Sequence, residues 1–180
     1  CVWSATYRGS RARPGLVFGL DQDGSNGSSA QGVAFDVAPA DRRAVLAYLF
    51  QRELIYPIYR PEMIRIETAA GPMAALAFVV DREDPAYAGG LAPAVRIAAI
   101  ASGAGRAGRA RDYLANALER LAEMGAPEPD LAAELSAADR LADDPCRLFG
   151  LLDEPARRRL DLVFQAGHER VPVEAGRDRL

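Results

Sequence analysis

The sequence has very few of the residues that most often bind metals or act as nucleophiles. Its 180 residues include one histidine, His168, and two cysteines, Cys1 and Cys146. A structural zinc site usually takes four such ligands, and neither a CxxC nor an HExxH pattern is present. A single histidine also argues against a Ser-His-Asp or Cys-His triad. We expect no metal site, so any catalysis must use carboxylates, hydroxyls and backbone groups.

Charge and hydropathy exclude two classes of partner. Lysine is absent, so all 22 cationic residues are arginine, and 25 acidic residues give a formal net charge of −3. A mildly acidic chain without a basic stripe is unlike a nucleic-acid-binding protein. There is no run of about 18 apolar residues that could cross a membrane, and no signal-peptide pattern. Two cysteines form at most one disulfide, so we expect a reducing, cytoplasmic compartment. From the charge and the hydropathy we expect no nucleic-acid partner and no membrane partner.

The hydrophobic patterning predicts an α+β fold. Apolar residues make up 49% of the chain, which suits one compact domain. Strand-like segments come first and helical periodicity follows, which argues against alternating βαβ units. We expect strands at 16–20 and 32–37, paired as a hairpin, and further strands from 64 and over 73–80. We expect helices over 40–53, 93–101, 109–124, 131–141 and 154–165.

Several conspicuous motifs have ordinary explanations. The pattern GxGxxG occurs at residues 103–108. A dinucleotide site would need a strand before this motif, yet the preceding segment reads as helical, so we favour a loop between two helices. The arginine run 157–159 is most simply a solvated helix face. We interpret His168 as an exposed tail residue and Cys146 as an inert thiol.

Glu53 is the strongest catalytic candidate by position. It closes the first predicted helix and precedes the apolar and aromatic stretch 54–59. A carboxylate at a helix C-terminus faces the negative end of the helix dipole, and apolar neighbours add desolvation. Both effects disfavour its charged form, which suits a general base that works near neutral pH. The alternative is an ordinary surface glutamate that is paired with an arginine.

An ordered series of short matches resembles the ChaC-like γ-glutamylcyclotransferases, which are glutathione-specific in the best-known cases. The matches extend over about residues 3 to 141 with spacing near that of the family. They are Tyr7-Arg8-Gly9, Arg13-Pro14-Gly15, Gly32-Val33-Ala34-Phe35, Tyr48-Leu49, Arg52-Glu53, Asp84-Pro85, Tyr87, Gly89, Gly105, Gly108 and Asp112-Tyr113-Leu114.

The resemblance implies a fold and a reaction. The fold would be a small mixed β-barrel or sheet flanked by helices, with a helical C-terminal part. The reaction would be an intramolecular aminolysis that cleaves glutathione or another γ-glutamyl amine without metal or cofactor. The family's essential acid falls on Glu53, and Tyr113 with Arg8 and Gly9 would hold the small-molecule substrate. We expect this domain over residues 1–144 and a helical, polar tail over 145–180.

The sequence also departs from the family pattern. It lacks the initial strand with its Tyr-Gly-Ser-Leu-type substrate loop, so the domain looks incomplete at its N-terminus and a barrel edge would be unpaired. Ala110 replaces a polar asparagine, and Ile55-Tyr56-Pro57-Ile58 replaces a Gly-Gly-like turn. These departures leave a second hypothesis open. The chain would then be a catalytically inactive relative that serves as a binding or scaffold module.

Overall fold

The computed structural model describes residues 1–22 and 29–143 and has the α+β architecture expected from the sequence. The predictions for Cys146, residues 154–165, the arginine run 157–159, His168 and the tail from 145 fall outside the described residues. The elements are β1 (Val2–Ser4), β2 (Gly15–Val17), α1 (Arg42–Glu53), β3 (Tyr59–Thr68), β4 (Gly71–Val80), α2 (Pro93–Ser102), β5 (Ala104–Gly105), β6 (Gly108–Arg109), α3 (Ala110–Glu123) and α4 (Pro129–Ala142).

The described strands pair two by two in antiparallel fashion: β1 with β2, β3 with β4, and β5 with β6. The β3–β4 hairpin is long, and its register runs from Tyr59 opposite Val80 to Thr68 opposite Gly71. Two isolated bridges, Val2 to Tyr87 and Leu20 to Val79, join the short β1–β2 pair to the chain around β4. The strands expected from 64 and over 73–80 are confirmed.

The predicted hairpin of 16–20 with 32–37 is wrong. The first segment contributes to β2, which pairs with β1, while residues 32–37 form no strand. Val33 and Phe35 are 66% and 84% exposed. An alternating pattern makes a strand only where a neighbouring strand can bond its N–H and C=O groups. No strand pairing joins residues 32–37 to any described segment.

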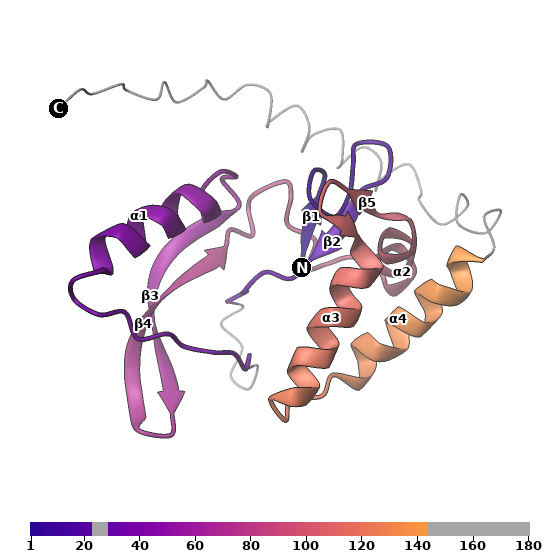
Figure 1. Ribbon diagram of the computed structural model, residues 1–180. Helices are drawn as coiled ribbons and strands as arrows, with labels where there is room; N and C mark the ends of the chain where they lie inside the picture. Colours follow the sequence, from indigo (N-terminus) through magenta and orange to yellow (C-terminus); the bar gives the residue numbers. More distant parts are fainter. Residues whose placement is uncertain (23–28, 144–180) are drawn as a thin grey trace, which may run out of the picture.

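Helices α2, α3 and α4 pack together as one layer, and the predicted helices of this region are confirmed (Figure 1). Their shared core contains Ile100, Leu114 and Leu141 with several buried alanines. Small alanine side chains let helix backbones approach closely. Ion pairs reinforce the layer at its surface, because Arg111 binds Asp139 on α4 through two N–H groups at 2.7 and 3.0 Å.

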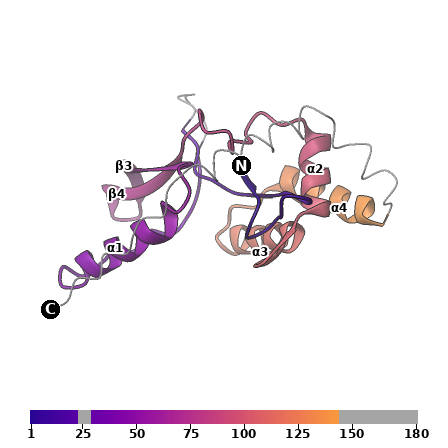
Figure 2. The ribbon, with the colours of Figure 1, turned by 90° about the horizontal axis from the view of Figure 1, so that it is seen from above.

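The helix α1 packs differently, although its predicted range is also confirmed. It lies along the β3–β4 hairpin, apart from α2–α4 (Figures 1 and 2). None of its residues is buried. Phe50 meets Phe78 of β4 edge to face, with ring centroids 5.8 Å apart. The molecule therefore has two parts, a helical layer with β1–β2 and a hairpin with α1.

Buried side chains from both parts meet near the N-terminus. Val2 of β1 packs with Val80 of β4 and with Ile58, which lies just before β3. Each is 3% exposed or less. The Asp81 N–H donates to the Ile58 carbonyl at 2.7 Å, and the Val80 N–H donates to the Leu20 carbonyl at 2.8 Å. This cluster fixes the segment that follows Glu53.

A core truncation measures how much the helical layer contributes to stability. We expect Leu114→Ala to lower the free energy of unfolding by about 3 kcal/mol, because it leaves a cavity among α2, α3 and α4. Met124→Ala, at the end of α3 where the side chain is 40% exposed, should cost less than about 1 kcal/mol. Chemical denaturation followed by circular dichroism compares them. Equal losses would contradict the assigned core.

Candidate active site

Glu53 is the last residue of α1, as the sequence suggested, and its side chain is 25% exposed. Its carboxylate Oε1 lies 2.6 Å from Nη2 of Arg52. The Tyr48 hydroxyl and the Glu53 carboxylate both raise the pKa of the Arg52 guanidinium. The arginine pairing considered as the alternative is therefore present.

Tyr113 lies on the first turns of α3 and faces the loop after β1. Its hydroxyl accepts a hydrogen bond from the Phe18 N–H at 3.2 Å, and its ring lies 5.9 Å from that of Phe18. The Arg8 guanidinium stands 5.4 Å from the Tyr113 ring centroid. Burial raises the pKa of Tyr113, and the hydrogen bond from Phe18 and the charge of Arg8 offset this in part. The phenol is thus neutral at physiological pH.

Arg8 and Gly9 lie in the turn between β1 and β2. The Arg8 N–H donates to Oγ of Ser4 at 3.0 Å, and its guanidinium donates to the Ala107 carbonyl. A Cβ at Gly9 would lie 2.1 Å from the Ser4 carbonyl oxygen and 2.2 Å from the Gly15 nitrogen. Gly9 is therefore required by close packing, whereas the Arg8 side chain carries a charge beside Tyr113.

Tyr59 is the first residue of β3, and the sequence analysis did not single it out. Burial raises the pKa of Tyr59, and the nearby Tyr113 hydroxyl and Glu53 carboxylate raise it further. The only sequence signal was that Tyr59 starts an alternating strand directly after the Glu53 loop.

The GxGxxG segment is a tight connection between α2 and α3, as favoured from the sequence. Its residues form the short β5–β6 pair. A Cβ at Gly105 would lie 2.5 to 2.6 Å from the carbonyl oxygens of Gly9, Thr6 and Tyr7. Gly108 has φ of +105°, a conformation that favours glycine. The glycines therefore serve backbone packing.

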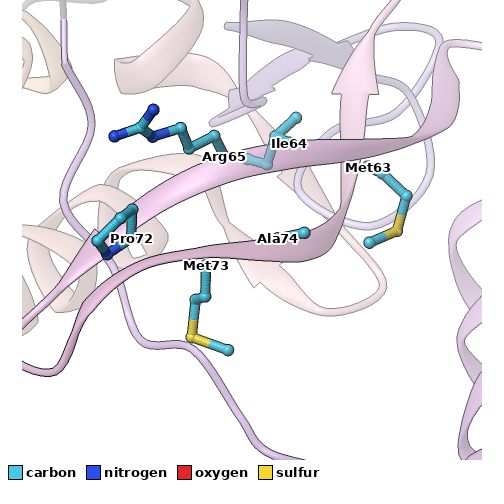
Figure 3. Close-up of a pocket in the computed structure, with 6 residues that line it drawn as sticks. All are labelled: Met63, Ile64, Arg65, Pro72, Met73 and Ala74. Carbon is cyan, nitrogen blue, oxygen red and sulfur yellow. The ribbon is translucent and has the colours of Figure 1, made fainter.

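The described residues also line two hollows. One, of about 390 Å³, lies on the β3–β4 hairpin and is lined by Met63, Ile64, Arg65, Pro72, Met73 and Ala74 (Figure 3). Another, of about 250 Å³, is lined by Gln22, Arg60, Val79, Val80, Asp81, Arg82 and Glu83. Neither includes Glu53, Tyr59 or Tyr113. The first offers no acid or base, so we assign it no chemistry.

The described ranges, residues 1–22 and 29–143, contain neither a metal-ligand cluster nor a helix suited to a membrane. Within these ranges no group of three or more His, Cys, Asp or Glu side chains is arranged to hold a metal ion. Nor does any helix there have the length and apolar character needed to span a bilayer.

Comparison with known proteins identifies two similarities. Residues 1–138 match the family model described as ChaC-like protein. Among solved structures, the chain is similar to a selenomethionine-labelled γ-glutamyl cyclotransferase specific to glutathione from yeast. The TM-score is 0.57 at 18% identity, over 77% of this chain and 81% of that chain. No curated protein matches the chain.

The shared environment of Tyr59 and Glu53 has a measurable consequence. We expect Glu53→Gln to lower the pKa of Tyr59, because the substitution removes a negative charge that disfavours the phenolate. NMR titration of ring-labelled tyrosine, with the Tyr59 signal assigned by Tyr59→Phe, follows the change. Glu67→Gln, at a side chain 69% exposed on the far end of the hairpin, is the control. If the pKa of Tyr59 is the same in Glu53→Gln and in wild type, Glu53 does not act on Tyr59.

Proposed function

The chain belongs to the ChaC-like protein family, and from this membership we propose that it is a γ-glutamylcyclotransferase that cleaves glutathione. The yeast structure of similar fold is specific to glutathione, which supports this choice of substrate. The products are 5-oxoproline and Cys-Gly. Because the scarcity of cysteine suits a reducing compartment, we place the activity in the cytoplasm.

The reaction is an internal displacement. The α-amino nitrogen of the γ-glutamyl group attacks its own γ-carbonyl carbon, a new C–N bond closes the five-membered ring, and the amide C–N bond to cysteine breaks. Because the α-amino group starts as an ammonium, two protons leave the attacking nitrogen and two are added to the departing nitrogen, which leaves as an ammonium, so no water is consumed. Because the nucleophile is tethered to the electrophile, holding the folded-back conformer supplies much of the acceleration.

Glu53 is the proposed general acid/base. An α-amino group has a pKa near 8 and is mostly protonated at neutral pH, so a base must take its proton. The carboxylate is partly exposed, which leaves it accessible to substrate. The same group then returns the proton to the leaving nitrogen.

Tyr113 and Arg8 are the proposed substrate-holding groups. Burial keeps the Tyr113 phenol neutral, so its O–H can donate to a carbonyl oxygen as that oxygen gains negative charge. The Arg8 guanidinium lies beside this ring and offers a cation for a substrate carboxylate. The observation that carries the proposal is the partly exposed carboxylate of Glu53 at the end of α1 in a chain that belongs to this family.

The decisive assay measures product release. We expect the full chain to release 5-oxoproline and Cys-Gly from glutathione in equal amounts, quantified by mass spectrometry, with no effect of EDTA. Glu53→Gln should lower kcat by about a hundredfold or more, because it removes the proton acceptor. Its circular dichroism spectrum should be unchanged.

Two results would overturn this assignment. The first is wild-type protein that releases neither product, and the second is Glu53→Gln protein that is as active as wild type. Glu67→Gln, far from the site on the hairpin, serves as the matched control and should retain full activity. Glutathione binding without turnover would instead favour the inactive binding module.

A second substitution tests the substrate-holding role. We expect Tyr113→Phe to lower kcat/KM by about tenfold, because one hydrogen bond to a developing charge is lost from a partly buried site. Steady-state kinetics with glutathione measure this, and Tyr87→Phe, at a hydroxyl that donates to Asp21 at 2.7 Å, is the comparison. Unchanged kinetics for Tyr113→Phe would remove Tyr113 from the site.

A further inference from the structure

The position of Glu53 is not explained by the packing of its own helix. No residue of α1 is buried, so the helix alone cannot place the carboxylate accurately. The loop 54–58 that follows it is anchored at its end, where Ile58 is 3% exposed among Val2 and Val80. Something must also fix the middle of this loop if Glu53 is to keep one position relative to the turn after β1.

Tyr56, in the middle of the loop, reaches the other part of the molecule. Its hydroxyl donates a hydrogen bond to Oγ1 of Thr6 at 3.1 Å. Its ring meets the Tyr7 ring edge to face, with centroids 6.5 Å apart and planes at 88°. Both contacts are made to the turn after β1, the same turn that carries Arg8.

The turn after β1 is itself held against the start of α3. The Arg106 and Ala107 N–H groups donate to the carbonyls of Thr6 and Tyr7 at 3.0 and 2.8 Å. The Arg106 guanidinium stands 4.2 Å from the Tyr7 ring centroid. The Tyr7 ring is therefore contacted by a cation from the β5–β6 connection and by Tyr56 from the Glu53 loop.

We propose that Tyr56, Thr6, Tyr7 and Arg106 form a clamp that fixes the loop after Glu53, and thereby Glu53, relative to the turn that carries Arg8. We call these four residues the aromatic clamp, and Tyr56 is its positioning residue. Tyr56 does not touch the reacting atoms. It acts by fixing the loop that carries Glu53, and this inference rests on the proposed function. Each contact is weak and partly exposed, but a small displacement of a catalytic group lowers the rate disproportionately.

The kinetic signature separates positioning from substrate binding. The clamp places the base, whereas Arg8 and Tyr113 hold the substrate. Tyr56→Phe should therefore lower kcat by about fivefold, and Tyr56→Gly by about tenfold to a hundredfold. KM should change by less than about twofold in both, because the substrate-holding groups stay in place.

A double-mutant cycle tests whether Tyr56 acts through Thr6. Thr6→Val removes the acceptor hydroxyl, so it should lower kcat about as much as Tyr56→Phe does. The two together should cost no more than either alone, because the same hydrogen bond is removed twice. Phe35→Leu, at an aromatic side chain 84% exposed and outside the clamp, should leave kcat unchanged.

The outcomes distinguish this inference from the proposed function. If wild type releases 5-oxoproline and Tyr56→Gly keeps the wild-type kcat with an intact circular dichroism spectrum, the clamp has no catalytic role while the proposed function stands. Fully additive effects of Tyr56→Phe and Thr6→Val on kcat would likewise overturn the proposed clamp. If wild type is inactive, the proposed function fails and the catalytic role of the clamp fails with it.

Amide hydrogen exchange tests the physical contact without reference to activity. Tyr56→Gly should raise the exchange rates of residues 53–58 at least tenfold, while residues 93–102 in α2 should exchange as in wild type. Unchanged exchange over 53–58 would mean that Tyr56 does not hold the loop.

Discussion

The close backbone contact between the turn after β1 and the turn before α3 is the constraint on which the candidate site depends. Gly105 lies so near the carbonyls of Gly9, Thr6 and Tyr7 that no side chain fits there. The neighbouring N–H groups of residues 106 and 107 bond two of these carbonyls. The contact therefore places Arg8 beside the first turns of α3, where its guanidinium stands next to the Tyr113 ring. A larger residue at position 105 would separate the two turns and move both side chains.

The segment that follows Glu53 joins the two parts of the molecule. The helix α1 packs on the hairpin without burying a residue, so its C-terminus is held from outside the helix. Ile58 anchors one end of the loop in the core, where an apolar side chain gains most from burial. Tyr56 then reaches across to Thr6. A partly exposed carboxylate can be held accurately by residues that come after it in the chain.

Local patterns predicted the elements well, because helical periodicity and strand alternation are properties of a few neighbouring residues. The position of Glu53 at a helix end was correct for this reason. The 32–37 segment was predicted wrongly, because a strand also requires a partner that local alternation does not report. Tyr59 and Tyr56 were missed as site residues for a similar reason. Their importance comes from contacts with residues far along the chain, such as Tyr113 and Thr6, which no spacing rule reveals.

Because histidine and cysteine are scarce, the proposed site divides its tasks between a carboxylate and phenol groups. Burial raises the pKa values of Tyr59 and Tyr113, so both phenols stay protonated and can donate a hydrogen bond through the O–H group. Glu53 is partly exposed, and its carboxylate contacts Arg52. A displacement within one substrate molecule needs one proton carrier and a few donors, and this chain provides them without any residue that must titrate near neutrality as histidine does.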